Sequence, residues 1–227
     1  LVEVERHSIY FLLKFRKLFP HGFPSFWKEG NPCGIQHMRN FNFYFKMNTL
    51  NSPLSALHLL STYPETIVDG EGIRYSIYLA GCSHHCVGCH NPESWNPRAG
   101  ELLTEERIQS IIREIKANPL LDGVTFSGGD PFYNPEAFLL FVKRVKKETG
   151  LNIWCYTGYH FDRDLLRWME EGDPVITELL PLLDVIVDGE FIEERKNLRL
   201  AFRGSENQRI LDVQLSLREK CGKLLAV

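Results

Sequence analysis

The chain has 227 residues, of which 44% are hydrophobic and 24% are charged, and its formal net charge is −3. This balance is typical of a globular protein of one or two domains. The small net charge gives no indication of a nucleic-acid or membrane partner. The longest apolar run, Ala137 to Val142, is far shorter than the roughly 20 residues that a membrane-spanning helix needs.

Six cysteines are unevenly distributed along the chain. Three lie in one short run and three are scattered: Cys82, Cys86 and Cys89, against Cys33, Cys155 and Cys221. A disulfide framework would space its cysteines more evenly, in a smaller secreted chain. The chain also shows no basic region followed by a sustained apolar stretch, so no secretory signal is predicted. We therefore expect a reducing, cytoplasmic setting.

The first 46 residues differ in composition from the rest. They hold 11 of the 27 aromatic residues, and seven Lys and Arg against three Asp and Glu, whereas residues 47–227 carry 19 against 26. No helical or strand period persists through them. We therefore predict an N-terminal extension over residues 1–46 and one domain over residues 47–227, beginning at Met47. The extension is interpreted as disordered, as an aromatic docking arm or, by preference, as sequence foreign to the native protein.

The first half of this domain shows two strands around one helix. Arg74 to Ala80 alternates and is rich in β-forming residues, which predicts a strand that runs into Gly81 and the cysteines. Thr104 is a predicted N-cap, and isoleucines from Ile108 to Ile115 follow at helical spacing. Val124 to Ser127 is predicted to be a short buried strand that ends at two glycines.

The second half continues the alternation. Asn134-Pro135 is predicted to open a helix that ends at Gly150. Leu151 to Tyr156 and Asp184 to Val187 are predicted strands, with a helix near Phe161 to Glu170 between them. Alternating strands and helices predict a parallel sheet, and the strands are too few for a closed eight-stranded barrel. We therefore predict an α/β fold, namely an open, partial (β/α) barrel with a mostly parallel sheet.

Ligands of parallel α/β folds collect at the carboxyl ends of the strands. Polar or glycine-rich loops are predicted at four such ends, over residues 81–91, 127–130, 157–159 and 188–191. We expect these loops to converge at one mouth.

The cysteine run has the spacing C-x3-C-x2-C, which places Cys82, Cys86 and Cys89 on one tight loop. Three thiolates can hold three corners of a four-iron cube, whose fourth iron is then left without a protein ligand. The alternative is a zinc ion with a histidine as fourth ligand. The candidate histidines are His84, His85 and His90.

Three further segments carry candidate binding residues. In SGGDP, Gly128 and Gly129 permit close backbone approach to a ligand, and the Asp130 carboxylate suits a ligand ammonium group. Each of these positions, like Thr157-Gly158 and Asp188, is alternatively part of a simple turn. The last segment offers clustered donors that form either a solvated face or a contact with a carboxylate or peptide: Arg203, Asn207, Gln208 and Arg209.

The cysteine run and the Gly-Gly-Asp turn together resemble the radical S-adenosylmethionine enzymes. Their signature is C-x3-C-x2-C after the first strand and a Gly-Gly-acidic motif after the second. Many members have an aromatic residue just before the third cysteine, where this chain has Gly88. A narrower resemblance is to the activating proteins of anaerobic ribonucleoside-triphosphate reductase. It rests on GCSHHCVGCHNPESW (81–95), TFSGGDP (125–131), YTGY (156–159), VDGEF (187–191) and RGSENQR (203–209), and leaves residues 1–46 outside.

The resemblance implies one [4Fe–4S] cluster on Cys82, Cys86 and Cys89, with S-adenosylmethionine bound to the open iron. We predict that the cofactor lies beside residues at the other strand ends: Gly128, Gly129, Asp130, Thr157, Gly158 and Asp188. Reductive cleavage of S-adenosylmethionine would then generate a glycyl radical on the partner reductase, with no side-chain acid or base required. A low-potential electron donor such as flavodoxin or ferredoxin is also implied.

Two alternatives stay open at this point. The target of the activase could be another glycyl-radical enzyme, such as formate C-acetyltransferase. From a different class, the chain could be a zinc-binding interaction module without catalysis.

Overall fold

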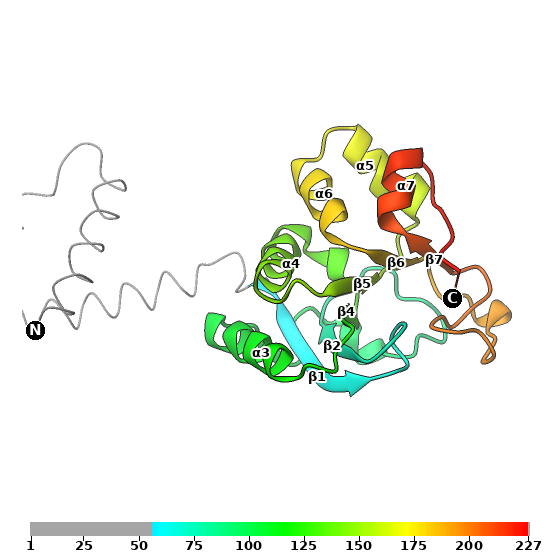
Figure 1. Cartoon of the computed structure of the whole chain (residues 1–227). Helices are drawn as coiled ribbons and strands as arrows, with labels where there is room; N and C mark the ends of the chain where they lie inside the picture. Colours follow the sequence, from blue (N-terminus) through cyan, green and yellow to red (C-terminus); the bar gives the residue numbers. More distant parts are fainter. Residues whose placement is uncertain (1–55, 227) are drawn as a thin grey trace, which may run out of the picture. The chain divides into compact units, whose positions relative to one another are not determined.

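A computed structural model describes residues 56–226 of the chain (Figure 1). The predicted extension over residues 1–46, the boundary at Met47 and Cys33 lie outside the described residues. Among the helices of residues 56–226, none combines the length and the hydropathy that crossing a bilayer requires.

Seven strands form one mixed sheet in the order β3-β1-β2-β4-β5-β6-β7. They are β1 (His58–Thr66), β2 (Arg74–Leu79), β3 (Glu101–Leu102), β4 (Gly123–Gly128), β5 (Asn152–Tyr156), β6 (Val185–Asp188) and β7 (Arg209–Asp212). The four central strands β2, β4, β5 and β6 are parallel, whereas β1, β3 and β7 pair antiparallel with their neighbours. The sheet does not close on itself, so the predicted α/β fold with an open sheet and parallel central strands is confirmed.

The helices gather on one side of this sheet in Figure 1. They are α3 (Glu105–Ala117), α4 (Pro135–Thr149), α5 (Arg167–Glu170), α6 (Pro174–Leu179) and α7 (Val213–Glu219). A π-helical turn, η4 (Phe161–Leu166), runs directly into α5 where a single helix was predicted. Short 3-10 turns complete the chain: η2 (Pro92–Trp95), η3 (Pro131–Tyr133), η5 (Leu180–Leu182) and η6 (Glu193–Arg195).

The main core lies between the helices and the sheet. Phe126 of β4 meets Phe138 and Phe141 of α4, with ring centroids 5.1 and 5.3 Å apart. The predicted isoleucine stripe of α3 is buried in the same core. Successive side chains of a strand point to opposite faces, so alternate residues of β2 also enter it: Tyr75, Ile77 and Leu79.

The predicted helix ends are found where expected. The Thr104 hydroxyl accepts a hydrogen bond from the Arg107 amide at 3.3 Å, and the Asn134 side chain accepts one from the Ala137 amide at 3.3 Å. Gly150 ends α4 in the left-handed region, with φ of 69°. The predicted central strands are present within a residue or two of their expected bounds, whereas β1, β3, β7, α6 and α7 were not predicted.

A buried arginine organises the amino ends of the central strands. Arg74 is 1% exposed, donates from Nε to the Thr125 hydroxyl at 2.6 Å and lies 5.1 Å over the Trp154 ring. Burial lowers the pKa of Arg74 to about 10, so it remains a cation at neutral pH. A Cβ at Gly123 would lie 2.5 Å from this guanidinium, so glycine is required beside it. These contacts lie at the opposite end of the strands from the four predicted loops.

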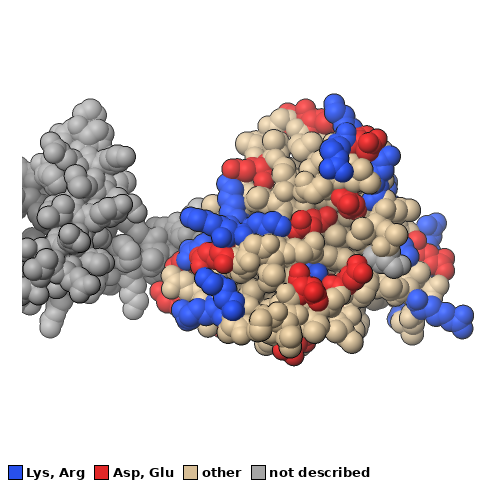
Figure 2. Space-filling view, viewed as in Figure 1, with Lys and Arg blue, Asp and Glu red and all other residues tan. Residues whose placement is uncertain are grey.

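Charged side chains are paired across the helices. Figure 2 shows Lys and Arg side chains on the helix-covered face with Asp and Glu among them. Arg144 of α4 pairs with Glu105 of α3 at 2.9 Å, and Lys143 of α4 pairs with Glu178 of α6 at 2.6 Å. These ion pairs link α4 to the helix on either side.

Candidate functional site

The four predicted loops meet at the carboxyl ends of the four parallel strands. The Asp130 amide after β4 donates to the Gly81 carbonyl after β2 at 2.8 Å. The Gly158 amide after β5 donates to the Asp130 carboxylate at 2.9 Å, and the Gly189 amide after β6 donates to the Tyr159 carbonyl at 3.1 Å. The structure therefore brings these loops together at one end of the sheet.

The cysteine loop presents three thiols on one short segment. Cys82, Cys86 and Cys89 are free and partly exposed, and the Cys89 amide donates to the Cys86 carbonyl at 3.1 Å. Within residues 56–226, no three His, Cys, Asp or Glu side chains are arranged to hold a single metal ion. A four-iron cube has a different requirement, since it distributes its thiolate ligands over separate irons. Three accessible soft sulfur donors on one loop fit such a cluster.

The other cysteines of the described chain lie elsewhere in the fold. Cys155 is buried within β5, where burial raises the pKa of its thiol well above the usual value. Cys221 is partly exposed in the segment after α7.

The two glycines of the Gly-Gly-Asp turn allow one loop backbone to touch another. A Cβ at Gly128 would lie 2.5 Å from the Leu79 amide nitrogen, and a Cβ at Gly129 would overlap the Gly81 carbonyl oxygen. The Gly129 amide donates to the Leu79 carbonyl at 2.7 Å. We predicted close approach to a ligand. The approach present in the structure is to the backbone that leads into the cysteine loop.

Asp130 joins three of the four loops. Its carboxylate is 3% exposed and accepts hydrogen bonds from the Phe132 amide at 2.9 Å, the Thr157 hydroxyl at 2.9 and 3.0 Å and the Gly158 amide at 2.9 Å. Its Oδ2 also lies 2.8 Å from His84 Nε2. Protein donors therefore surround this carboxylate, and a ligand ammonium group has to displace one of them to bind it. Its contact with a ligand stays a prediction.

His84 lies between two carboxylates. Its Nε2 faces Asp130, and its Nδ1 lies 3.0 Å from Glu190 Oε1. A carboxylate at each ring nitrogen favours the doubly protonated imidazolium, because only that form donates from both nitrogens. The hydrogen bond to Asp130 accordingly raises the pKa of His84. The sequence suggested this histidine as a possible zinc ligand, and nothing in the sequence marked Glu190 as its partner.

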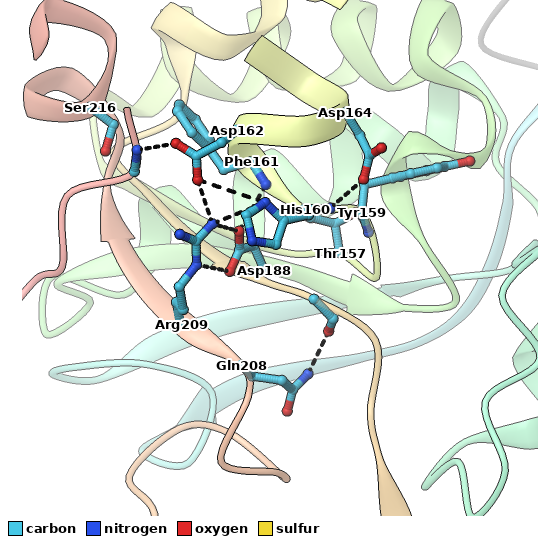
Figure 3. A network of polar contacts seen from close by, with 12 residues as sticks. Thr157, Tyr159, His160, Phe161, Asp162, Asp164, Asp188, Gln208, Arg209 and Ser216 are labelled. Atoms are coloured by element: carbon cyan, nitrogen blue, oxygen red, sulfur yellow. Dashed lines mark hydrogen bonds and ion pairs between the residues drawn. The ribbon is translucent and has the colours of Figure 1, made fainter. Parts of the chain in front are cut away.

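Asp188 forms an ion pair inside the protein (Figure 3). It is 1% exposed and accepts from Arg209 Nε at 3.0 Å and from the Phe161 amide at 2.8 Å. Arg209 also contacts Asp162 at 2.9 Å. These contacts account for the burial of the Asp188 carboxylate, and its predicted place beside the cofactor stays a prediction.

The RGSENQR segment binds a peptide segment of its own chain. Asn207 Nδ2 donates to the Glu190 carbonyl at 2.8 Å, and Gln208 Nε2 donates to the Gly189 carbonyl at 3.0 Å. Arg203 is turned inward as well, since its Nη1 donates to the Gln208 carbonyl at 3.0 Å. Of the two interpretations of this segment, the peptide and carboxylate contact is therefore the one present, rather than a solvated face.

Comparison with known proteins adds independent information. Residues 68–211 match the family model of a 4Fe-4S single cluster domain, and this range includes all three cysteines of the loop. The match supports the iron–sulfur interpretation of these cysteines over the zinc alternative.

Curated relatives are similar over nearly their whole length. The Haemophilus influenzae protein is 40% identical over 156 residues, which are 67% of this chain and 96% of the relative. The Vibrio cholerae protein is 39% identical and the Escherichia coli K12 protein 34% identical, each over 150 residues, 64% of this chain and 92% of the relative. All three carry the name anaerobic ribonucleoside-triphosphate reductase-activating protein. The cysteine loop, the turn docked against it and this similarity agree, and the chain belongs to the family of anaerobic ribonucleoside-triphosphate reductase-activating proteins.

Proposed function

We propose that this protein activates an anaerobic ribonucleoside-triphosphate reductase by generating a glycyl radical on it, using one [4Fe–4S] cluster and S-adenosylmethionine. The observation that carries this proposal is the direct docking of the Gly-Gly-Asp turn on the cysteine loop, through the hydrogen bond from the Asp130 amide to the Gly81 carbonyl at 2.8 Å. The target follows from membership in the family.

Cys82, Cys86 and Cys89 are the proposed ligands of the cluster, and a cluster with three thiolate ligands would keep one iron available to S-adenosylmethionine. A cluster held by these residues would supply one electron for the reductive cleavage of S-adenosylmethionine to methionine, and that cleavage would provide the means to take a hydrogen atom from a glycine of the reductase. An electron and a hydrogen atom move in this reaction. The protein therefore has to bind and orient the reactants, and no acid–base catalysis by its side chains is needed.

The residues around the mouth provide that orientation. Gly128 and Gly129 hold the turn against the cysteine loop, while Thr157 and Gly158 are fixed by the Asp130 carboxylate. We assign these four residues to the wall that faces the cofactor. Asp188 supports the same wall from within, through its hydrogen bond from the Phe161 amide at the start of η4.

The open sheet leaves one side of the mouth for the partner. We propose that a glycine-bearing segment of the reductase enters there and completes the enclosure of the cofactor. A low-potential donor such as flavodoxin or ferredoxin, acting in the cytoplasm, is the proposed source of the electron.

Anaerobic reconstitution tests this function directly. The reconstituted protein should contain iron and sulfide in the ratio of a [4Fe–4S] cluster. With a reductant it should form methionine and 5′-deoxyadenosine in equal amounts. Adding the reductase should then give the electron paramagnetic resonance signal of a glycyl radical.

Two outcomes contradict the proposal. A protein that takes up zinc but no iron and does not cleave S-adenosylmethionine is an interaction module. A radical that forms on formate C-acetyltransferase but not on the reductase identifies an activase of a different enzyme.

A further inference from the structure

We propose that His84 is a positioning residue, which fixes the cysteine loop by its contact with Glu190, and that the RGSENQR segment serves to anchor Glu190. This inference rests on the proposed function, since it concerns the loop that carries the cluster ligands. Residues 188–193 begin at the last residue of β6 and contain both Glu190 and the backbone that the RGSENQR segment contacts; they are called the brace below.

His84 touches the loops after all four parallel strands. It lies on the loop after β2, and its two ring nitrogens face Asp130 after β4 and Glu190 in the brace. Its ring packs edge-on against Tyr159 after β5, with centroids 4.6 Å apart. The side chain is only 9% exposed, and a Cβ at Gly158 would lie 2.5 Å from its Cδ2. A single imidazole thus sets the spacing of four loops that lie far apart in the sequence.

A second contact ties the brace to the cysteine loop at Gly88. This glycine has φ of +72°, and a Cβ on it would overlap the carboxylate of Glu193. An aromatic residue just before the third cysteine, as in many radical S-adenosylmethionine enzymes, would displace this exposed Glu193 side chain. The Glu193 side chain of the brace therefore lies against the part of the loop between Cys86 and Cys89.

The brace is held from its other side by three consecutive residues. Asn207 donates to the Glu190 carbonyl, Gln208 donates to the Gly189 carbonyl, and Arg209 pairs with Asp188. Gln208 is itself oriented, because its Oε1 accepts from the Gly204 amide at 2.9 Å. The backbone of Glu190 is therefore anchored, whereas its side chain is 55% exposed and reaches out to His84.

In this arrangement His84 and Glu190 orient the loop that carries the cluster ligands, without binding the cluster themselves and without belonging to the hydrophobic core. Groups that orient metal ligands from outside typically change metal affinity by about 10- to 100-fold when they are removed. The exposed carboxylate of Glu190 contributes little to a hydrophobic core, so its removal should affect the loop more than the fold.

The test compares Glu190→Ala and Glu190→Gln with Glu194→Ala. Glu194 lies next to the brace, is exposed, and makes no hydrogen bond or ion pair with the described residues 56–226. Each reconstituted protein is treated anaerobically with an iron chelator, and the half-life of the cluster absorbance is measured. Thermal unfolding of each apo protein is recorded in parallel.

We expect Glu190→Ala to shorten the half-life about tenfold with an unfolding temperature close to that of the unchanged protein. Glu190→Gln should restore most of the half-life, because its amide oxygen still accepts a hydrogen bond from His84. Glu194→Ala should behave like the unchanged protein. In a double-mutant cycle, adding Glu190→Ala to His84→Ala should cause no further loss, because the two side chains act as one unit.

Equal half-lives for Glu190→Ala and Glu194→Ala would overturn the inference, and so would fully additive effects of the His84 and Glu190 substitutions. Either result leaves the proposed function intact as long as the unchanged protein holds its cluster and cleaves S-adenosylmethionine. Failure of the unchanged protein in those two assays counts against the proposed function instead.

Discussion

Asp130 shows how single buried side chains organise the site. Its carboxylate receives donors from the loops after β2, β4 and β5, and each hydrogen bond to a charged group contributes about 1.5–3 kcal/mol. The glycines beside it contribute by lacking a side chain, which lets the backbones of two loops touch. At this scale, the site depends on close backbone contacts that tolerate few substitutions.

The cysteine assignment is tested by comparing one loop cysteine with one outside the loop. Cys86→Ala should abolish the cluster absorbance and the cleavage of S-adenosylmethionine, because one iron of the cube loses its thiolate. Cys221→Ser should keep both, since Cys221 lies after α7. Iron content per chain and the visible spectrum after reconstitution are measured for both variants. A normal cluster in Cys86→Ala would show that the ligands are wrongly assigned.

Gly129→Ala tests the docking of the Gly-Gly-Asp turn. The added methyl group overlaps the Gly81 carbonyl, so we expect a loss of about 1–3 kcal/mol in the free energy of unfolding. Iron content should fall as well, because Gly81 directly precedes Cys82. Urea unfolding and iron analysis give the two quantities.

Gly172→Ala provides the control for this substitution. Gly172 has φ of +91°, so alanine is strained there by about 1–2 kcal/mol. Its added methyl group meets no atom within 4 Å, so iron content should not change. If Gly129→Ala also keeps its full iron content, the turn does not support the cysteine loop.

Among the elements, β6 and β7 show how a short antiparallel pair is secured. Each has four residues, and Asp188 and Arg209 face each other at the end of their ladder. Arg209 reaches on to Asp162, whose other oxygen accepts from the Gly222 amide at 2.6 Å. One cation thus connects β6, β7, η4 and the C-terminal segment (Figure 3).

Arg209→Met should destabilise the domain strongly. It leaves the buried Asp188 carboxylate without its cation, and breaking such a pair costs about 3–5 kcal/mol in the free energy of unfolding. Arg209→Lys should recover only part of this loss, because an ammonium group lacks the planar fork that serves two carboxylates.

The control is Arg199→Met, at an exposed position, which should change the free energy of unfolding by no more than about 0.5 kcal/mol. Urea unfolding of the three variants supplies the comparison. The interpretation is wrong if Arg209→Met and Arg199→Met are equally stable.

For the whole molecule, the described domain contains the sheet, its helices and every candidate site residue. The family model matches within it, over residues 68–211. The different composition of residues 1–46 leads to a prediction about the chain as a whole rather than about one element.

A chain that starts at Met47 should fold, bind iron and activate the reductase as the longer chain does, because the proposed site and the core found within residues 56–226 lie after that residue. Iron content, thermal unfolding and radical formation are measured for both chains side by side. Loss of solubility or of the cluster in the shorter chain would show that residues 1–46 belong to the functional protein.

The sequence by itself determined the features that depend on near neighbours. The caps at Thr104 and Asn134, the end of α4 at Gly150 and the central strands were all predicted, because such patterns act over a few residues. The cysteine spacing and the Gly-Gly-Asp turn can also be recognised in the sequence alone. The resemblance to the family was inferred from these motifs.

Only the tertiary structure decided which residues meet. Strands β3 and β7, of two and four residues, escaped prediction because such short strands depend on their partners more than on their own composition. The nine-residue β1 escaped it because Leu59 is its only buried residue, so its sequence lacks a regular alternation of buried and exposed positions. His84 and Glu190 are separated by 106 residues, so no local pattern relates them. Their contact, like the docking of Gly129 on Gly81, exists because the parallel strands place their carboxyl ends side by side, and packing of the whole sheet fixes that arrangement.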